Sequence, residues 1–105
     1  MNPYFVYVTT KDASEAACIG RTVVSERLSA CANILDSMKS FYWWKEALQE
    51  ENESVLILKT TDTRLPALIE RIKALHSYEC PCVVALPIVA GYSGFLQWIA
   101  RETSV

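Results

Sequence analysis

Hydrophobic residues recur along this chain with two different periods, and the changes between them predict its elements. Residues 4–10 are rich in aromatic and β-branched side chains, which favours a strand. Asp12 followed by Glu15 forms a capping-box-like pattern that predicts a helix start. Small and apolar residues then recur with helical spacing at Ala16, Ile19, Gly20, Val23, Val24 and Leu28. Because glycine weakens a helix, Gly20 predicts a point of close approach between this helix and a sheet.

The next apolar segments predict a long hairpin. Residues 30–35 are short and apolar and predict a second strand, and residues 37–44 continue the extended pattern into an aromatic end. The polar residues 45–52 predict the turn, and residues 55–58 predict the returning strand. A hairpin of this length is more than a small sheet requires, which indicates a further role for its aromatic arm.

A second helix and a final strand complete the pattern. Asp62 or Thr63 is expected to cap a helix whose apolar residues follow i, i+3, i+4 and i+7 spacing, namely Leu65, Leu68, Ile69, Ile72 and Leu75. Pro66 falls in the first turn of this helix, where a missing backbone donor is tolerated. Residues 83–86 predict a strand that the following proline ends, and Ser93 is expected to cap a short C-terminal helix.

The order of these elements is β-α-β-β-α-β with one appended helix. This order belongs to the α+β class and predicts a ferredoxin-like sandwich, formed as one domain from residues 1–105. Right-handed crossovers place both main helices on one face of the sheet. The strands are apolar on both faces, so the opposite face would stay exposed unless another chain covers it. We therefore expect an obligate oligomer.

Composition and charge narrow the functional classes. The chain is 51% hydrophobic and 21% charged with a formal net charge of -2, so it lacks the basic excess that is typical of nucleic-acid binding. No apolar run approaches the roughly 20 residues that span a bilayer, and the N-terminus does not resemble a signal peptide. The cysteines show no disulfide-scaffold spacing. These features predict a cytoplasmic protein that binds neither nucleic acid nor membrane.

The densest group of candidate metal ligands lies before the last strand. His76, Glu79, Cys80 and Cys82 are close together, and the histidine is the only one in the chain. Thiolate and imidazole ligands favour soft or borderline ions such as Cu(I) and Zn(II), and in an extended strand both thiols would face one side. The alternative is structural: the thiols would start the strand as small apolar groups, and His76 would cap or abut the preceding helix.

Other candidate residues have simpler interpretations. Tyr42, Trp43 and Trp44 are expected to form interface core between subunits, with a ligand-binding shelf as the alternative. Cys18 and Cys31 are expected to be buried or inert thiols. The sequence contains no recognisable trio of nucleophile, base and orienting group, no G-x-S-x-G motif and no phosphate-binding loop. We therefore expect no catalytic activity.

Several short motifs occur in the order and spacing of one protein family. They are E-R-L-S-A-C-A-N-I at residues 26–34, Y-W-W at 42–44, V-L-I-L-K-T at 55–60, H-S-Y-E-C-P at 76–81 and A-L-P-I at 85–88 followed by Gly91. Together they resemble the CutA family of divalent-cation tolerance proteins over nearly the whole domain. This resemblance implies a ferredoxin-like fold and a tight homotrimer whose long hairpins pack between subunits, with a trimer interface at Tyr42, Trp43 and Trp44.

The chain departs from the family pattern at positions that bear on metal binding. In family members with assigned copper ligands, a cysteine ends the first strand and two adjacent histidines precede the last one. Here Thr9 stands at the first position and Leu75 precedes His76, so that copper site is not carried over. Cys82 replaces the usual glutamate and changes the ligand chemistry. Glu46 stands where a glycine usually follows the tryptophan segment, which leaves the geometry of the hairpin turn open.

The first functional hypothesis is a cytoplasmic homotrimer that acts in divalent metal ion tolerance or response without catalysis, with copper or another soft metal ion as a candidate ligand. The alternative is a trimeric small-molecule sensor or protein-interaction hub analogous to PII-like signalling proteins. That alternative is weakened because the chain lacks a basic, glycine-rich loop for nucleotide phosphates. A heavy-metal chaperone would need C-x-x-C after the first strand, where residues 9–12 read T-T-K-D.

Overall fold

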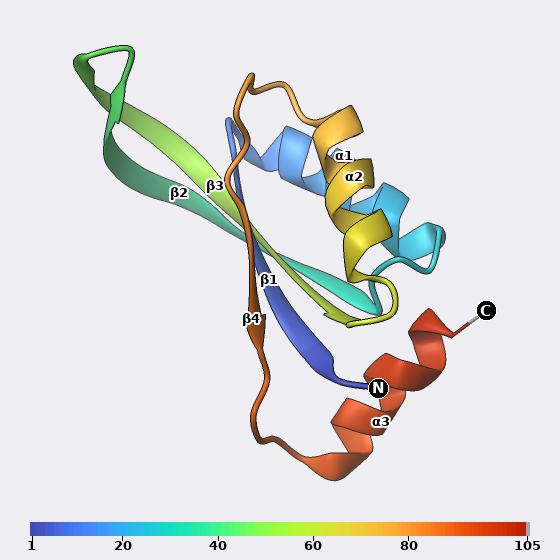
Figure 1. The fold of residues 1–105 in the computed structure, drawn as a ribbon. Helices are drawn as coiled ribbons and strands as arrows, with labels where there is room; N and C mark the ends of the chain where they lie inside the picture. Colours follow the sequence, from blue (N-terminus) through green and yellow to red (C-terminus); the bar gives the residue numbers. More distant parts are fainter. Residues whose placement is uncertain (105) are drawn as a thin grey trace.

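Seven elements make up the fold, which the computed structural model describes for residues 1–104. In chain order they are β1 (Pro3–Thr10), α1 (Ala13–Ser25), β2 (Cys31–Trp44), β3 (Ala47–Thr61), α2 (Leu65–Leu75), β4 (Val83–Pro87) and α3 (Ser93–Thr103). This is an α+β fold with a four-stranded antiparallel sheet and three helices (Figure 1). The order of elements predicted from hydrophobic periodicity is confirmed.

The strands lie in the order β2-β3-β1-β4, so β1 and β3 are central. Alternate residues of these strands point toward the helices. Val6 pairs with Leu58 and Val8 with Leu56 across the β1–β3 ladder, and all four are fully buried. The helices α1 and α2 lie side by side on this face (Figure 1). Their apolar stripes complete the core, which includes Ile19, Val23, Leu68 and Ile72.

Two sequence signals in α1 are confirmed by the geometry of their side chains. Asp12 is the N-cap, and its carboxylate accepts a hydrogen bond of 2.8 Å from the backbone N–H of Glu15. A Cβ atom at Gly20 would come within 3.1 Å of Ala32 Cβ and 3.2 Å of Leu56 Cδ1. Glycine therefore lets α1 approach the sheet more closely than a residue with a side chain would allow.

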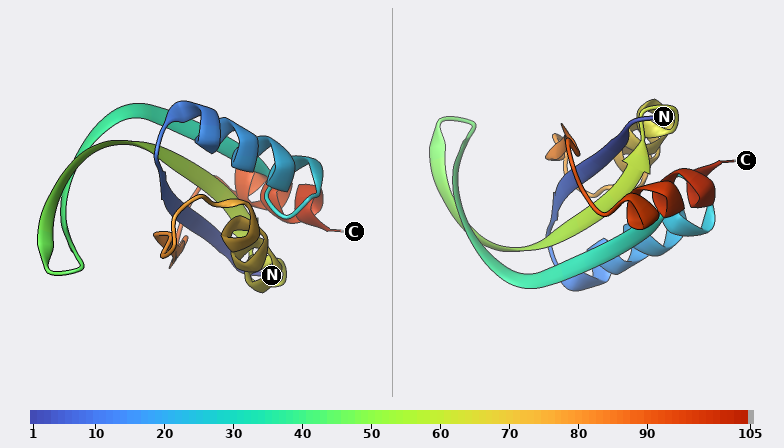
Figure 2. Two further views of the ribbon diagram at one scale, coloured as in Figure 1. Left: turned by 90° about the horizontal axis from the view of Figure 1, so that it is seen from above. Right: turned by 90° about the horizontal axis from the view of Figure 1, so that it is seen from below.

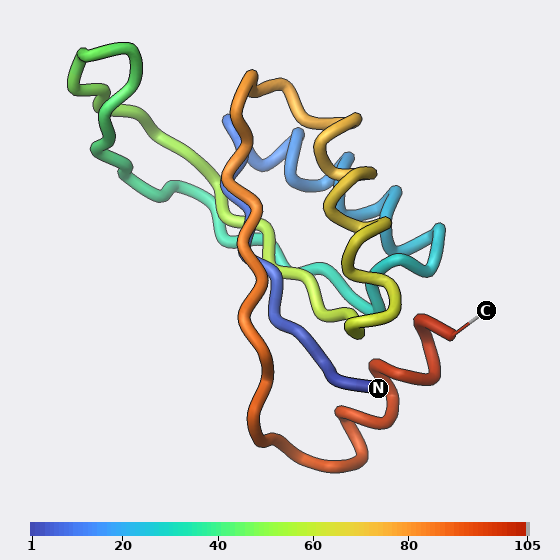
Figure 3. Tube along the Cα trace, in the orientation of Figure 1, coloured from blue at the N-terminus to red at the C-terminus, as the bar shows by residue number. Residues whose placement is uncertain are grey.

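The β2–β3 hairpin extends beyond the sheet and curves strongly, as the views in Figure 2 show. The chain reverses at Lys45 and Glu46, whose φ angles of 49° and 64° lie in the left-handed region. The prediction of a turn across residues 45–52 was wrong, because β3 already begins at Ala47 and these polar residues pair with β2. The trace in Figure 3 follows both arms from the sheet to this tip.

A β-bulge joins the two extended segments that the sequence pattern separated. β2 is one continuous strand with an irregularity between Leu35 and Met38, where Ser37 has a φ of 62°. The extra residue shifts the pairing register, so Met38 lies opposite Glu53. The bulge therefore determines which side chains of the hairpin share a face.

Two predicted helix caps were wrong. α2 has Arg64 as its N-cap without a side-chain capping bond, whereas the Asp62 carboxylate accepts two other backbone hydrogen bonds. α3 begins at Ser93 itself, and Tyr92 occupies its N-cap position. Pro66 lies in the first turn of α2, as predicted.

The sheet face opposite α1 and α2 carries exposed apolar side chains. Leu35, Val84 and Leu86 are 59%, 48% and 54% exposed. Their pairing partners on the central strands place them on the side opposite to Val6 and Val8. Apolar surface of this kind is typical of a face that another molecule covers.

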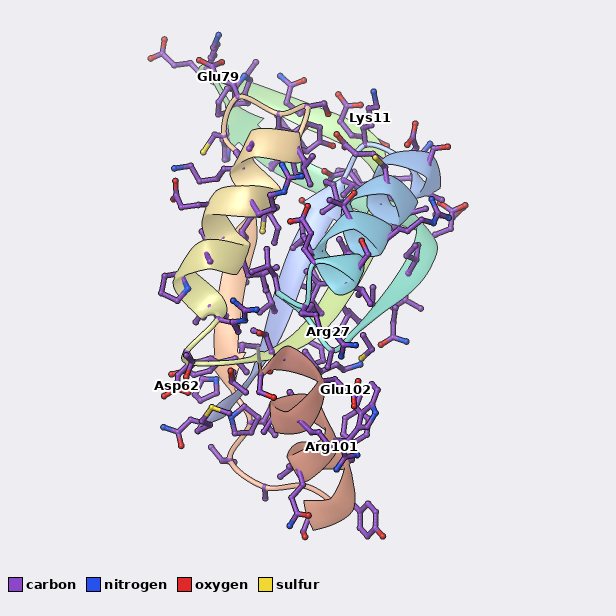
Figure 4. The ribbon with its side chains drawn as sticks, turned by 90° about the vertical axis from the view of Figure 1, so that its right-hand side faces the viewer. Lys11, Arg27, Asp62, Glu79, Arg101 and Glu102 are labelled. Atoms are coloured by element: carbon purple, nitrogen blue, oxygen red, sulfur yellow. The ribbon has the colours of Figure 1, made fainter. Side chains whose placement is uncertain are left out.

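The helix α3 packs against β1 and β3, at the opposite end of the molecule from the hairpin tip (Figure 1). Its Ile99 is fully buried. Arg27, just after α1, forms an ion pair of 2.9 Å with Glu102 of α3, and both residues are labelled in Figure 4. In the described part of the chain, no helix has the length and apolarity needed to cross a bilayer.

Candidate functional site

A groove of about 970 Å³ lies between the β2–β3 hairpin and the loop of residues 76–82. Its lining combines polar, aromatic and sulfur-containing side chains, among them Thr9, Glu53, Tyr78, Tyr42, Trp44, Cys80 and Cys82. We call it the hairpin groove. It brings together the aromatic arm and the cysteine-containing loop, which the sequence presented as two separate features.

His76 lies behind the groove and anchors the loop to β1. Its side chain is fully buried, with Nε2 2.7 Å from the carbonyl oxygen of Thr9 and Nδ1 3.1 Å from the backbone nitrogen of Tyr78. A carbonyl only accepts and an amide N–H only donates, so the ring is neutral, with Nε2–H donating and Nδ1 accepting. Neither nitrogen therefore has a free lone pair for a metal ion. This geometry agrees with the structural alternative for His76.

Glu15 holds the same loop from the start of α1. Its Oε1 accepts a hydrogen bond of 3.0 Å from the Lys11 backbone N–H, and Oε2 accepts one of 2.8 Å from that of Ser77. Burial alone raises the pKa of Glu15. The hydrogen bonds from Ser77 and Lys11 outweigh burial, so the pKa of Glu15 lies below its ordinary value of 4.5. The ionised carboxylate thus stabilises the folded loop.

Tyr78 extends a polar contact from the loop into the groove. Its hydroxyl donates a hydrogen bond of 2.7 Å to Oε2 of Glu53, a residue that is only 7% exposed. Burial, together with this carboxylate, raises the pKa of Tyr78 well above its ordinary value of 10.0, so the hydroxyl keeps its proton. The other oxygen, Oε1 of Glu53, accepts no hydrogen bond from any residue between 1 and 104.

The structure separates the four predicted metal ligands into different environments. Glu79, labelled in Figure 4, is exposed and forms an ion pair of 3.6 Å with Lys45 at the hairpin tip. Cys80 and Cys82 are exposed free thiols that both line the groove. The strand begins at Val83, as predicted, so the structural alternative in which both thiols start it was wrong. Within residues 1–104, no three His, Cys, Asp or Glu side chains gather as a potential metal site.

The aromatic arm divides its side chains between two faces of the hairpin. Successive residues of a strand point to opposite faces, so Tyr42 and Trp44 share one face while Phe41 and Trp43 share the other. Tyr42 and Trp44 are 37% and 38% exposed, against 64% and 73% for Phe41 and Trp43. Pairing of Met38 with Glu53 places Glu53 on the same face as Tyr42 and Trp44.

Some features of the site were not found by sequence reasoning. Glu53 was missed because its role depends on the bulge register and on a hydrogen bond with Tyr78, 25 residues away. Tyr78 lies in the recognised H-S-Y-E-C-P motif, which was a usable signal. Cys18 and Cys31 were expected to be buried or inert thiols; Cys18 is exposed on α1 and Cys31 is only partly buried, so neither is a buried thiol.

Comparisons with known proteins agree on one family. The family described as CutA1 divalent ion tolerance protein matches residues 4–102. The divalent-cation tolerance protein CutA of Thermus thermophilus is 41% identical over 93% of this chain and 95% of its own length. The chloroplastic protein CutA 1 of Oryza sativa is 40% identical over 93% of this chain. The chain spans only 55% of the rice relative and 54% of the human protein CutA, about half their length.

Solved structures agree with this match. The structure of CutA1 from Oryza sativa superposes with a TM-score of 0.95 and 38% identity, covering 99% of this chain and 95% of that one. The divalent cation tolerance protein from Thermus thermophilus gives a TM-score of 0.94 and 39% identity, covering 97% and 99%. Sequence and structure thus identify the chain in the same way: it belongs to the CutA1 divalent ion tolerance protein family.

Proposed function

We propose that this chain acts in divalent metal ion tolerance or response as a cytoplasmic, non-catalytic homotrimer with a ferredoxin-like subunit. Family membership supports the metal-related role. The strand order β2-β3-β1-β4 and the helix-free apolar face support the fold type and the assembly. The cytoplasmic location stays a prediction from the sequence, since the names of relatives include a chloroplastic and a periplasmic protein.

We further propose that Cys80 and Cys82 bind a soft metal ion such as Cu(I) or Zn(II). The observation that carries this proposal is that two exposed, free thiols line the same groove. Thiolates prefer soft ions over Mg(II) or Ca(II). Both ring nitrogens of His76 are hydrogen-bonded, so any further ligands would come from Glu79, from water or from a neighbouring subunit.

A paired set of variants tests the thiol site. Cys80→Ser with Cys82→Ser is expected to abolish Cu(I) binding, measured by competition with a chromogenic chelator, while native mass spectrometry still finds the parent oligomer. Affinity of the parent should fall as pH drops, because protons compete for the thiolates. The matched control is Cys18→Ser with Cys31→Ser, which makes the same chemical change outside the groove. Equal Cu(I) affinity in the two double variants would reject the site.

The second candidate function is a small-molecule sensor. The hairpin groove favours it, because a concave site lined by aromatic residues and a few polar groups is typical of small-molecule binding. The acidic side chains Glu53 and Glu79 in the lining argue against a nucleotide phosphate as the ligand. Cys80 and Cys82 line this groove as well. A small molecule that binds the Cys80→Ser, Cys82→Ser variant as tightly as the parent would therefore separate the sensor function from the thiol site.

A further inference from the structure

Glu53 is a buried carboxylate that no positive charge of its own subunit neutralises. It is 7% exposed, and its hydrogen bond from Tyr78 comes from a neutral hydroxyl. No Lys, Arg or His between residues 1 and 104 forms an ion pair with it. Burying an unpaired charge is costly, so this position favours a positive group supplied from outside the subunit.

Lys59 is a complementary cation on the same strand. Every second residue of β3 points to the same face, so Lys59 lies with Glu53 on the face opposite α1 and α2. Its Nζ donates a hydrogen bond to the amide oxygen of Asn33 and, within residues 1–104, forms no ion pair with a carboxylate. By the same alternation, Lys59 is the one cation that the four strands of the described chain place on this face.

The two side chains cannot meet within one subunit. They stand six positions apart on β3, which at about 3.3 Å per residue separates their Cα atoms by roughly 20 Å. An ion pair needs its nitrogen and oxygen atoms within about 4 Å. Val55 and Ile57 lie between the two charges on the same face, and the exposed Leu35 pairs with Val55. The face therefore has an apolar centre with a negative group at one end and a positive group at the other.

The other cations of the subunit are paired or lie elsewhere. Lys39 and Lys45 on the hairpin form ion pairs with carboxylates of their own subunit. Lys11 lies between β1 and α1, Arg21 lies on α1, and Arg64 precedes α2. These three residues are in or beside the helices and not on the strands of the helix-free face. A second copy of the chain, by contrast, carries its own lysine on the face that the homotrimer would bury.

We propose that Glu53 of each subunit forms an ion pair with Lys59 of the partner subunit in the homotrimer. This inference rests on the proposed homotrimer and names a contact that sets its register. In a closed ring of three, each contact joins different parts of the two surfaces, so one end of this face meets the other end on the next copy. Glu53 is already buried in the subunit, so most of its desolvation cost is incurred before assembly. Tyr78 occupies Oε2, which leaves Oε1 as the acceptor for the ammonium group.

A double-mutant cycle on the full chain tests the pair. Glu53→Gln keeps an oxygen acceptor for Tyr78, and Lys59→Gln keeps a side-chain donor. Each variant is expected to weaken the assembly about tenfold or more per ion pair, measured by chemical denaturation at several protein concentrations. Adding the second substitution to the first should then cost little more, because the pair is already broken. Purely additive losses would overturn the proposal, since they would give each residue a role within its own subunit.

The matched control is Glu51→Gln. Glu51 lies two positions from Glu53 on the same face, but it is exposed. Its substitution should add to Lys59→Gln without coupling. Equal coupling of both glutamates with Lys59 would show a diffuse charge effect and overturn the specific pair. A parent chain that sediments as a monomer would reject the homotrimer as well, whereas a stable oligomer with an uncoupled cycle would reject this contact alone.

A second measurement leaves Glu53 unchanged and stays decisive if Glu53→Gln does not fold. The carboxyl carbon resonance of Glu53 is followed by NMR in protein made with isotope-labelled glutamate. We expect this resonance to move in Lys59→Gln and to stay near its parent position in Lys59→Arg, which keeps the charge. An unmoved resonance in Lys59→Gln would overturn the proposal, because the ion pair places the ammonium group directly beside that carboxyl group.

Discussion

The hairpin turn holds two residues in a strained backbone conformation. Lys45 and Glu46 both have positive φ angles, although neither is glycine or asparagine. An L-residue in the left-handed region costs about 1–2 kcal/mol, and glycine avoids this cost. We expect Glu46→Gly to raise the free energy of unfolding by about 1 kcal/mol, measured by chemical denaturation at fixed protein concentration. Glu46→Ala removes the same carboxylate but keeps Cβ; an equal gain in that variant would contradict the strain argument.

Glu15 makes the stability of the loop depend on pH. Its folded-state pKa lies below the ordinary value of 4.5, so the ionised carboxylate stabilises the fold above that pH. This contribution is lost as pH falls through the lower folded-state value. We expect Glu15→Gln to destabilise the protein at neutral pH and to approach the parent in acid, measured by denaturation across the pH range. Glu70→Gln changes an exposed carboxylate as a control, and a constant difference for Glu15→Gln would refute the linkage.

The sequence identified the candidate ligands in the 76–82 loop, but it did not show which of their atoms are free of hydrogen bonds and able to bind a metal ion. The side-chain types alone marked His76, Cys80 and Cys82 as candidates. Whether the His76 ring can bind a metal ion depends on its hydrogen bond with the Thr9 carbonyl, which is 67 residues away in the chain. No local sequence pattern indicates this contact. The same limit explains why Glu53 was missed, because its burial and its contact with Tyr78 exist only in the folded hairpin.

At the scale of elements, order was predictable and several boundaries were not. Strands and helices that face the core repeat their apolar residues with a clear period, so α1, α2 and β4 were located correctly. The hairpin projects beyond the core, so its polar residues 47–52 pair as strand without a buried face to mark them. α2 and α3 begin without a side-chain capping bond, so the cap residues expected from the sequence did not mark their N-caps.

The bulge between Leu35 and Met38 determines which hairpin side chains face the hairpin groove. One extra residue in β2 changes which residues of the two arms share a face. The register places Glu53 with Tyr42 and Trp44, and it leaves Phe41 and Trp43 on the other face. A sequence pattern gives the alternation within each arm, but the offset between the arms comes only from the structure. The division of the hairpin side chains between the groove and the outer surface therefore depends on the bulge, which the hydrophobic periodicity of the sequence does not reveal.

At the scale of the whole molecule, apolar surface is distributed over two regions. One is the sheet face with Leu35, Val84 and Leu86, and the other is the outer face of the hairpin with Phe41 and Trp43. A long projecting arm with exposed aromatic rings suits contact with another copy of the chain. Both regions support the proposed homotrimer, in which the hairpin of one subunit would cover the apolar face of the next.

The assembly is tested by truncating two tryptophans on opposite faces of the hairpin. We expect the parent to sediment as a trimer at every workable concentration, without a folded monomer. Trp43 is 73% exposed in the subunit and Trp44 only 38%, so the outer ring has more surface to bury against a neighbour. Trp43→Ala should therefore weaken the assembly by about 3–5 kcal/mol per site, the cost of truncating a buried tryptophan, and Trp44→Ala should weaken it less. A stable parent monomer in sedimentation equilibrium would reject the trimer. A trimer unaffected by Trp43→Ala would show that the outer face of the hairpin is not the contact, because removal of its most exposed ring would then have cost the assembly nothing.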